Sequence, residues 1–175
     1  MTTVRIIRLV VLAIGLGFTL TAPPLAVTPA HASCVDPARP GVMWRRCDFS
    51  GSNLSGIDIS GGSLAGARFL RSDLIGAIFS EANIDRAKFV TADMTGATLD
   101  RTRARGTDFT KANLTRASFN GGDLRRARFF EAILIDADFT GAQLEGADFL
   151  NANLSGATWT DGETVCAPAS IGRCK

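Results

Sequence analysis

Large apolar residues recur at every fifth position through most of this sequence. Stepping by five from Phe49 to Trp159 meets a large apolar residue at 22 of 23 positions, and Ala104 is the exception. The residue two positions earlier is small in almost every unit, usually Ala, with Ile57 the largest exception. A helix repeats about every 3.6 residues and a strand every two, so neither explains the pattern. We therefore expect two inward residues and three outward residues in each five-residue unit.

A chain that turns a corner after every unit has four sides, so four units make one complete coil. Phe alternates with smaller aliphatic residues along the central positions, as in Phe129, Leu134, Phe139 and Leu144. This arrangement places Phe on two opposite sides and Leu on the other two. Facing columns of this kind would fill a narrow core at ordinary packing density.

The units ADFTG, ADFLN, ANLSG and ANLTR resemble the repeat A(D/N)LXX of the pentapeptide-repeat family. The resemblance covers residues 47–161, which we expect to form the repeat domain. It implies an all-β fold, a right-handed quadrilateral β-helix of about 5.75 coils. With coils about 4.8 Å apart, the body would be about 25–28 Å long.

Residues 1–32 have the features of a secretory signal peptide. Arg5 and Arg8 precede an apolar run, prolines follow it, and Ala30-His31-Ala32 is a small-x-small cleavage site. We expect cleavage after Ala32 and a secreted, periplasmic or cell-envelope location. The alternative is a segment retained as a membrane anchor, for which the apolar run is short.

Two cysteines lie at each end of the repeat. Residues 33–46 would form an N-terminal cap segment and residues 162–175 a C-terminal cap, since a solenoid must cover its exposed core and backbone. A disulfide needs Cα atoms within about 7 Å, much less than the expected length of the body. The pairs that fit are Cys34 with Cys47 and Cys166 with Cys174; the alternative is four unpaired thiols.

The charge balance and the composition argue against catalysis and against metal or cofactor binding. Of the 19 Lys and Arg, Arg5 and Arg8 lie in the expected signal peptide, which leaves 17 to balance 17 Asp and Glu. The single His is also in that segment, and the chain has no Tyr. We therefore expect no enzyme activity, no cofactor, no metal site and no small-molecule substrate, and nucleic acid is a poor candidate partner. The double glycines Gly61-Gly62 and Gly121-Gly122 are expected at corners rather than in a phosphate loop.

Carboxylates precede many central residues and could suggest a paired-carboxylate site. They fall in the D/N position of the repeat, so we interpret them as part of the repeat. The residues are Asp48, Asp58, Asp73, Asp93, Asp108, Asp123, Asp138 and Asp148.

Residues one coil apart, which means four units along the chain, should stack and so define two candidate surfaces. One is a basic patch that could bind an anionic partner. The interleaved charges favour the alternative, a solvated face whose arginines pair with Asp85, Asp100, Asp123 and Glu145. The residues of the patch are Arg101, Arg103, Arg105, Arg125 and Arg126. The other is an apolar patch for a protein partner or for self-association; the alternative is that these residues only reflect the β-propensity of a flat sheet. Its residues are Leu70, Val90, Phe130, Ile133, Ile135 and Leu150.

The sequence favours an exported, non-enzymatic structural or protein-interaction module. The resemblance also suggests an alternative, because some family members protect DNA gyrase by mimicking duplex DNA. Those members are cytoplasmic, dimeric and strongly acidic, whereas this chain has an expected export signal, balanced charge and a cysteine-containing end. Gyrase protection is therefore the second hypothesis.

Overall fold

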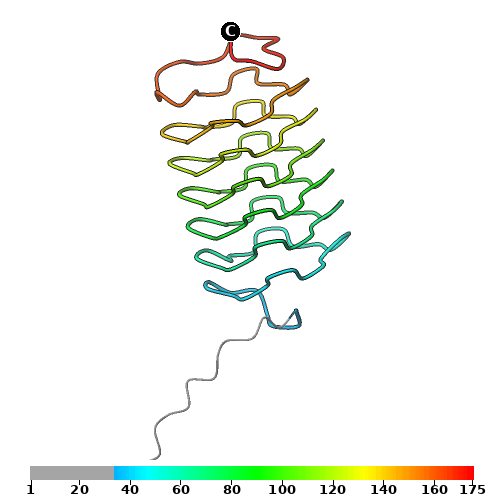
Figure 1. Cartoon of the computed structure of the whole chain (residues 1–175). Helices are drawn as coiled ribbons and strands as arrows, with labels where there is room; N and C mark the ends of the chain where they lie inside the picture. The colour runs from blue at the N-terminus through cyan, green and yellow to red at the C-terminus, as the bar shows by residue number, and fades with distance from the viewer. Residues whose placement is uncertain (1–33) are drawn as a thin grey trace, which may run out of the picture.

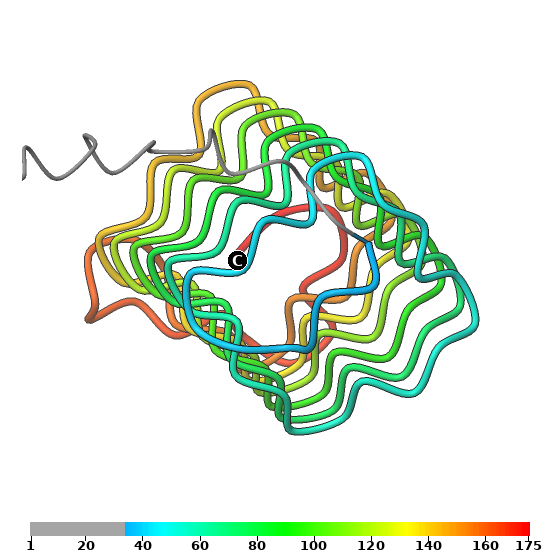
Figure 2. The ribbon, with the colours of Figure 1, turned by 90° about the horizontal axis from the view of Figure 1, so that it is seen from below.

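The structure is a computed structural model that describes residues 34–175, so the expected signal peptide lies outside the described residues. The chain winds into stacked four-sided coils, seen from the side in Figure 1 and end-on in Figure 2. Parallel bridges join residues of each coil to their counterparts in the next, from Met43 with Ser63 to Asp138 with Thr158. Residues 34–175 contain these isolated bridges and no helix or longer strand. No helix in that range is long and apolar enough to span a membrane.

Each corner is a tight turn with a left-handed residue. At a typical corner the N–H of Ala67 donates to the carbonyl of Leu64 at 2.9 Å, and Gly66 between them has φ of 71°. A positive φ recurs at every fifth residue from Gly41 to Gly156, and it is the feature that a type II turn requires at its third residue. Even the β-branched Thr91 adopts φ of 56°. The five-residue period is therefore a period of turns.

Three kinds of backbone hydrogen bond tie each side to its neighbours. The N–H of Leu64 donates to Asn83 in the next coil at 2.7 Å, and Gly66 donates to Asp85 at 2.9 Å. The N–H of Ser63 donates back to Val42 in the preceding coil at 2.8 Å. The same pattern repeats around the coils, so interior coils satisfy their backbone through their neighbours.

The four sides are named here by their central residues. Side A carries Trp44, Leu64, Ile84, Ala104, Leu124 and Leu144; side B carries Phe49, Phe69, Phe89, Phe109, Phe129 and Phe149; side C carries Leu54, Leu74, Met94, Leu114, Leu134 and Leu154; side D carries Ile59, Phe79, Leu99, Phe119, Phe139 and Trp159. Most of these residues are fully buried.

Aromatic rings run the length of the core on side B. Successive Phe rings of that side stack with centroids 4.9–5.4 Å apart. Phe rings of side D meet them edge-on at 5.6–6.3 Å. Both arrangements are favourable for aromatic pairs. The expected facing columns are present, although side D mixes Phe with Ile, Leu and Trp.

The regular coil starts one unit earlier than the sequence pattern suggests. Gly41 already has a positive φ, Met43 forms the first bridge, and Trp44 is 2% exposed in the core. The boundary expected at Cys47 is therefore too late. In this first unit Val42 holds the small position and Trp44 the large one.

In each double glycine, only the first residue lies at a corner of the coil. Gly61 and Gly121 have positive φ, whereas Gly62 and Gly122 occupy the small inward position. A Cβ on Gly62 would come within 2.8 Å of the carbonyl oxygen of Ile59. A Cβ at Gly62 would therefore require a backbone shift, whereas at Gly122 the nearest atom, the carbonyl oxygen of Phe119, would be 3.1 Å away.

The C-terminal cap covers the last coil on sides C and D. Leu154, Gly156 and Trp159 have no following coil, and their N–H groups donate instead to Ser170, Cys166 and Thr164 at 2.7–2.9 Å. The Cys166–Cys174 disulfide closes this cap, and Cys34–Cys47 ties the N-terminal segment to the first coil. These are the two pairs expected from the length of the body.

Ala104 occupies a large-residue position without interrupting the backbone. Its N–H keeps the regular bond to Asp123, at 2.9 Å. The small positions on either side hold Thr102 and Thr107, both buried, whose hydroxyls donate to Phe79 and Ile84 in the preceding coil. We infer that the two threonine side chains occupy volume that Ala104 leaves vacant.

This inference predicts compensation among three positions. Ala104→Leu alone should destabilise by about 1–3 kcal/mol through overpacking. Thr102→Ala with Thr107→Ala should cost a similar amount through lost volume and lost hydrogen bonds, about 1–3 kcal/mol. The triple variant should recover most of the loss in urea unfolding. A triple variant whose loss equals the sum of the two would contradict the compensation.

The cap predicts a local effect of the second disulfide. Cys166→Ser with Cys174→Ser should lower stability by about 2–3 kcal/mol, because the loop it closes is short. Hydrogen exchange should accelerate first at the amides of Leu154, Gly156 and Trp159. Mid-body amides such as Leu114 serve as the internal control, and equal acceleration there would contradict a local cap.

Candidate interaction surfaces

The carboxylates that precede central residues support the backbone. All eight accept the N–H of the residue two positions later, at distances from 2.8 to 3.4 Å. The Ser50 hydroxyl and N–H lower the pKa of Asp48 below its usual value, and the Ser60 backbone N–H does the same for the pKa of Asp58. Asn residues in this slot make the same bond. The D/N position therefore provides an acceptor for the next turn.

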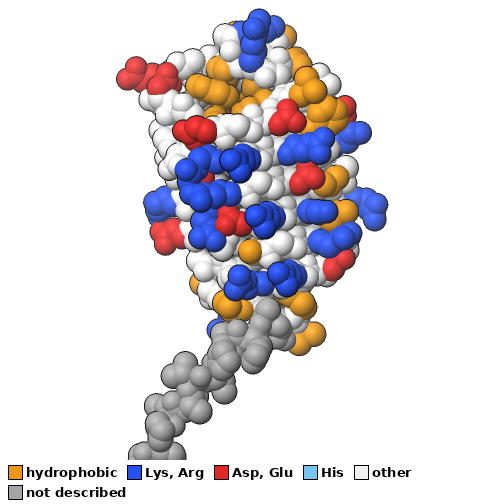
Figure 3. All heavy atoms as spheres, viewed as in Figure 1, with side chains coloured by type: hydrophobic (Ala, Val, Ile, Leu, Met, Phe, Trp, Pro, Cys, Tyr) orange, Lys and Arg blue, Asp and Glu red, His pale blue; other side chains and the backbone are white. Residues whose placement is uncertain are grey.

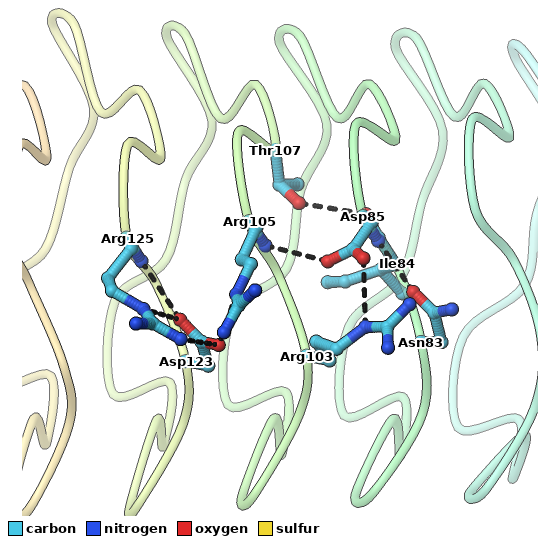
Figure 4. A network of polar contacts seen from close by, with 8 residues as sticks. All are labelled: Asn83, Ile84, Asp85, Arg103, Arg105, Thr107, Asp123 and Arg125. Atoms are coloured by element: carbon cyan, nitrogen blue, oxygen red, sulfur yellow. Dashed lines mark hydrogen bonds and ion pairs between the residues drawn. The ribbon is translucent and has the colours of Figure 1, made fainter.

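A charged network covers side A over the middle coils. Arg103 pairs with Asp85 at 2.8 Å, while Arg105 and Arg125 both converge on Asp123, at 2.5 and 2.8 Å (Figure 4). The two carboxylates are well shielded, with side chains 22% and 17% exposed. This network accounts for three of the five arginines of the expected basic patch.

The other two patch residues lie elsewhere. Arg101 is at the corner between sides D and A and pairs with Glu81 at 2.8 Å. Arg126, at the corner between sides A and B, has no ion pair within residues 34–175. Asp85 and Asp123 pair with the patch as anticipated. Asp100 instead accepts hydrogen bonds from Ser118 and Asn120, and Glu145 forms no ion pair within the described chain.

An open groove of about 890 Å³ runs along side A and its corner with side B. It is lined by Arg45, Arg46, Ala65, Gly66, Asn83, Asp85, Arg86, Arg103 and Arg105. A second hollow of about 360 Å³ continues it, lined by Arg86, Arg105, Gly106, Arg125 and Arg126. Figure 3 shows basic side chains outnumbering acidic ones over the middle coils of one face.

The basic patch predicted from the sequence omitted Arg45, Arg46 and Arg86. The signal that could have found the corner arginines is a spacing of two coils, at which Arg46, Arg86 and Arg126 alternate with glycines. A comparison of adjacent coils hides this spacing because every second member of the column is Gly.

The expected apolar patch divides into two parts. Leu70 and Val90 are half-buried, and Thr110 separates them from Phe130 in the same column. The Thr110 hydroxyl is buried without a hydrogen-bond partner in the described chain. Arg128 lies over the Phe130 ring at 5.7 Å, so that ring is partly covered.

The exposed part of the patch lies toward the C-terminal end. Leu150 is 59% exposed and Ile133 is 41% exposed, while Phe130 and Ile135 are half-buried. Ile171 of the cap, 46% exposed, bridges Asn153, the residue stacked on Ile133. The sequence pattern did not identify Ile171, because it lies in the cap outside the repeat.

The last coil also has an uncapped edge on sides A and B. The cap bonds described above serve sides C and D, and within residues 34–175 the N–H groups of Leu144, Gly146, Phe149 and Asn151 have no acceptor, although Gly172 of the cap lies close to the N–H of Asn151. Leu144 and Phe149 are only partly buried, unlike most central residues of the middle coils. We call these four residues together with Leu150 the C-terminal edge.

No cluster of three or more potential metal ligands occurs among the described residues. All four cysteines are in disulfides. The surfaces available for recognition are thus the side-A groove, the apolar patch and the C-terminal edge.

Comparisons with known proteins agree with this geometry. The sequence profile of pentapeptide repeats matches eight copies at residues 52–89, 92–129 and 123–158. No curated protein matches the sequence.

Several solved structures are similar to this chain, including the following three. The structure of QnrB1, a plasmid-mediated fluoroquinolone resistance protein, is 28% identical with a TM-score of 0.51, over 67% of this chain and 65% of QnrB1. This chain thus spans a little less than two thirds of QnrB1. The pentapeptide repeat protein Rfr23 from the cyanobacterium Cyanothece 51142 is 20% identical with a TM-score of 0.41, over 65% and 88% of the two chains. A pentapeptide repeat protein from the Arabidopsis thaliana thylakoid lumen is 25% identical with a TM-score of 0.35, over 74% and 84%.

The repeat profile covers more than half of the sequence, and the bridges, corners and core columns described above follow the same five-residue unit. This chain belongs to the pentapeptide-repeat family, and its fold is that family's right-handed quadrilateral β-helix.

Proposed function

We propose that this protein is an exported, non-enzymatic interaction module that binds a partner protein at its C-terminal edge. Pentapeptide-repeat proteins are generally structural or protein-interaction modules. The observation that carries the proposal is the half-capped last coil, where unpaired N–H groups and partly buried core residues lie beside the exposed Leu150.

The occupant that fits this edge is an extended segment of the partner. The N–H groups of Leu144, Gly146 and Phe149 occupy positions that donate to the next coil elsewhere in the body, so a strand could continue the ladder there, as far as Asn151, beside which Gly172 of the cap lies. Side chains of that strand would cover Phe149 and Leu144, as the next coil does for the central residues below.

The apolar patch, which includes Leu150, continues this surface from the last coil toward the preceding coils. Leu150 stacks directly on Phe130, and Ile133 follows on side C. A partner held by backbone bonds at the edge would gain specificity from apolar side chains on this patch.

The edge predicts where a selected ligand should bind. We expect linear peptides selected against the disulfide-intact residues 33–175 to shift the amide NMR signals of Leu144, Gly146, Phe149 and Asn151. Leu150→Asp should weaken such a peptide at least about tenfold, since a buried charge opposes apolar contact.

Ile75→Asp is the matched control, because Ile75 is also exposed, at 45%, but lies on side C far from the edge. It should leave the affinity unchanged. Peptides that shift mid-body signals only, or equal losses in both variants, would contradict the proposed site.

If the protein is exported, a cleaved form should be found outside the cytoplasm. Mass spectrometry of cell fractions should find a form that begins at Ser33, because Ala30-His31-Ala32 has the small residues that a cleavage site needs. An Ala30→Arg with Ala32→Arg variant should retain the leader. Intact protein confined to the cytosol would contradict export.

A second candidate function is protection of DNA gyrase, which the similarity to QnrB1 favours. Against it, residues 34–175 carry as many basic as acidic side chains, and the groove on side A is lined by arginine. The same fractions distinguish the two functions: cytosolic protein accompanied by reduced fluoroquinolone susceptibility would support protection and overturn export.

A further inference from the structure

We propose that the groove on side A binds a linear polyphosphate chain laid along the axis of the rod. The proposal goes beyond the protein-binding function, because it concerns the arginines along the corner between sides A and B, a surface that meets the C-terminal edge only at Gly146. It rests on the charge, the periodicity and the lining of the groove.

The groove has a large surplus of positive charge. Seven arginines line it and its continuation, and Asp85 and Asp123 are the carboxylates that pair with them. Arg45, Arg46, Arg86 and Arg126 form no ion pair with any residue in 34–175, whereas Arg103, Arg105 and Arg125 are paired. Four guanidinium groups are therefore available to an anion, and three are held in place by carboxylates.

The hollow shape follows from an alternation of arginine and glycine at one corner. Arg46, Arg86 and Arg126 hold the corner in every second coil, about 10 Å apart at the inter-coil spacing. Gly66, Gly106 and Gly146 hold it in the coils between. The absence of a side chain there leaves room between successive arginines.

The glycines also fix the direction of the arginine side chains. The Cγ atoms of Arg46, Arg86 and Arg126 lie 3.5, 3.9 and 3.5 Å from the points where a Cβ would stand on the following glycines. Each stem therefore lies along the next coil toward the C-terminus. Because the three arginines hold the same position in alternate coils, their charges repeat along the axis, which suits a linear ligand.

The lining favours a polymer of phosphate over a single-stranded nucleic acid. Guanidinium groups bind tetrahedral oxyanions through paired N–H donors. The lining contains arginine, glycine, alanine, one asparagine and one aspartate, and no aromatic residue. Single-stranded nucleic acids require aromatic platforms on which bases stack, so a polymer of phosphate alone fits the groove better.

The test titrates long-chain sodium polyphosphate into disulfide-intact residues 33–175 and follows heat release at two salt concentrations. We expect saturable binding that weakens steeply with salt, because several counterions are displaced. Arg86→Gln with Arg126→Gln should weaken the affinity at least about tenfold.

Arg71→Gln with Arg116→Gln is the matched control. These arginines occupy the same positive-φ slot at other corners and also have no ion pair in the described chain. The control removes the same charge and should change the affinity less than about twofold. Thermal unfolding of both variants checks that each is folded.

Three results would overturn the proposal. The first is no saturable polyphosphate binding at low salt. The second is an equal loss in both variant pairs, which would show attraction to net charge alone. The third is tighter binding of a single-stranded oligonucleotide or of anionic vesicles at the same arginines.

Discussion

A left-handed residue at every fifth position is the constraint on which this structure depends. From Gly41 to Gly156 the backbone turns with a positive φ at each corner, and four such corners return the chain to the same side, one coil further along. The inter-coil hydrogen bonds, the stacked Phe rings and the surface columns all require this return. Half of these positions hold residues other than glycine, so the inter-coil bonds and core packing must offset the cost of the left-handed conformation there.

The same constraint explains how recognition surfaces arise on so regular a body. A side chain in one coil has its equivalents about 4.8 Å above and below, so a surface is built as a column. Alternating arginine and glycine in one column make a charged groove, and Phe130 below Leu150 makes an apolar strip. At the end of the body the columns stop, and the cap replaces the missing coil on only two of the four sides.

Much of this fold can be predicted from the sequence because its interactions repeat. The phase of the central residues from Phe49 to Trp159 and the two disulfide pairs follow from the repeat period and the expected length. Single residues that depart from the repeat pattern are harder to interpret from the sequence. The unit of Trp44 lies next to the N-terminal cap segment and departs from the Phe and Leu alternation, and the role of Thr102 and Thr107 beside Ala104 depends on hydroxyl bonds to another coil.

The surfaces could be predicted only in part, because the pairing of individual side chains does not follow the repeat. Columns of residues one coil apart identified Leu150 and Phe130, and they identified Arg103, Arg105 and Arg125. They did not show which arginines pair: Asp123 binds two, while Arg86 and Arg126 remain unpaired in residues 34–175. The uncapped edge could not be anticipated, because the path of the cap is not periodic.

Deletion of one whole coil tests the central claim most directly. Removing residues 92–111 takes out four complete units and keeps every column in phase, whereas removing residues 92–109 stops within a unit and shifts every later inward residue. The account predicts that the whole-coil deletion unfolds cooperatively with a native-like circular dichroism spectrum, and that the out-of-phase deletion loses protection in hydrogen exchange after the junction. Equal stability and equal protection of the two deletions would contradict it.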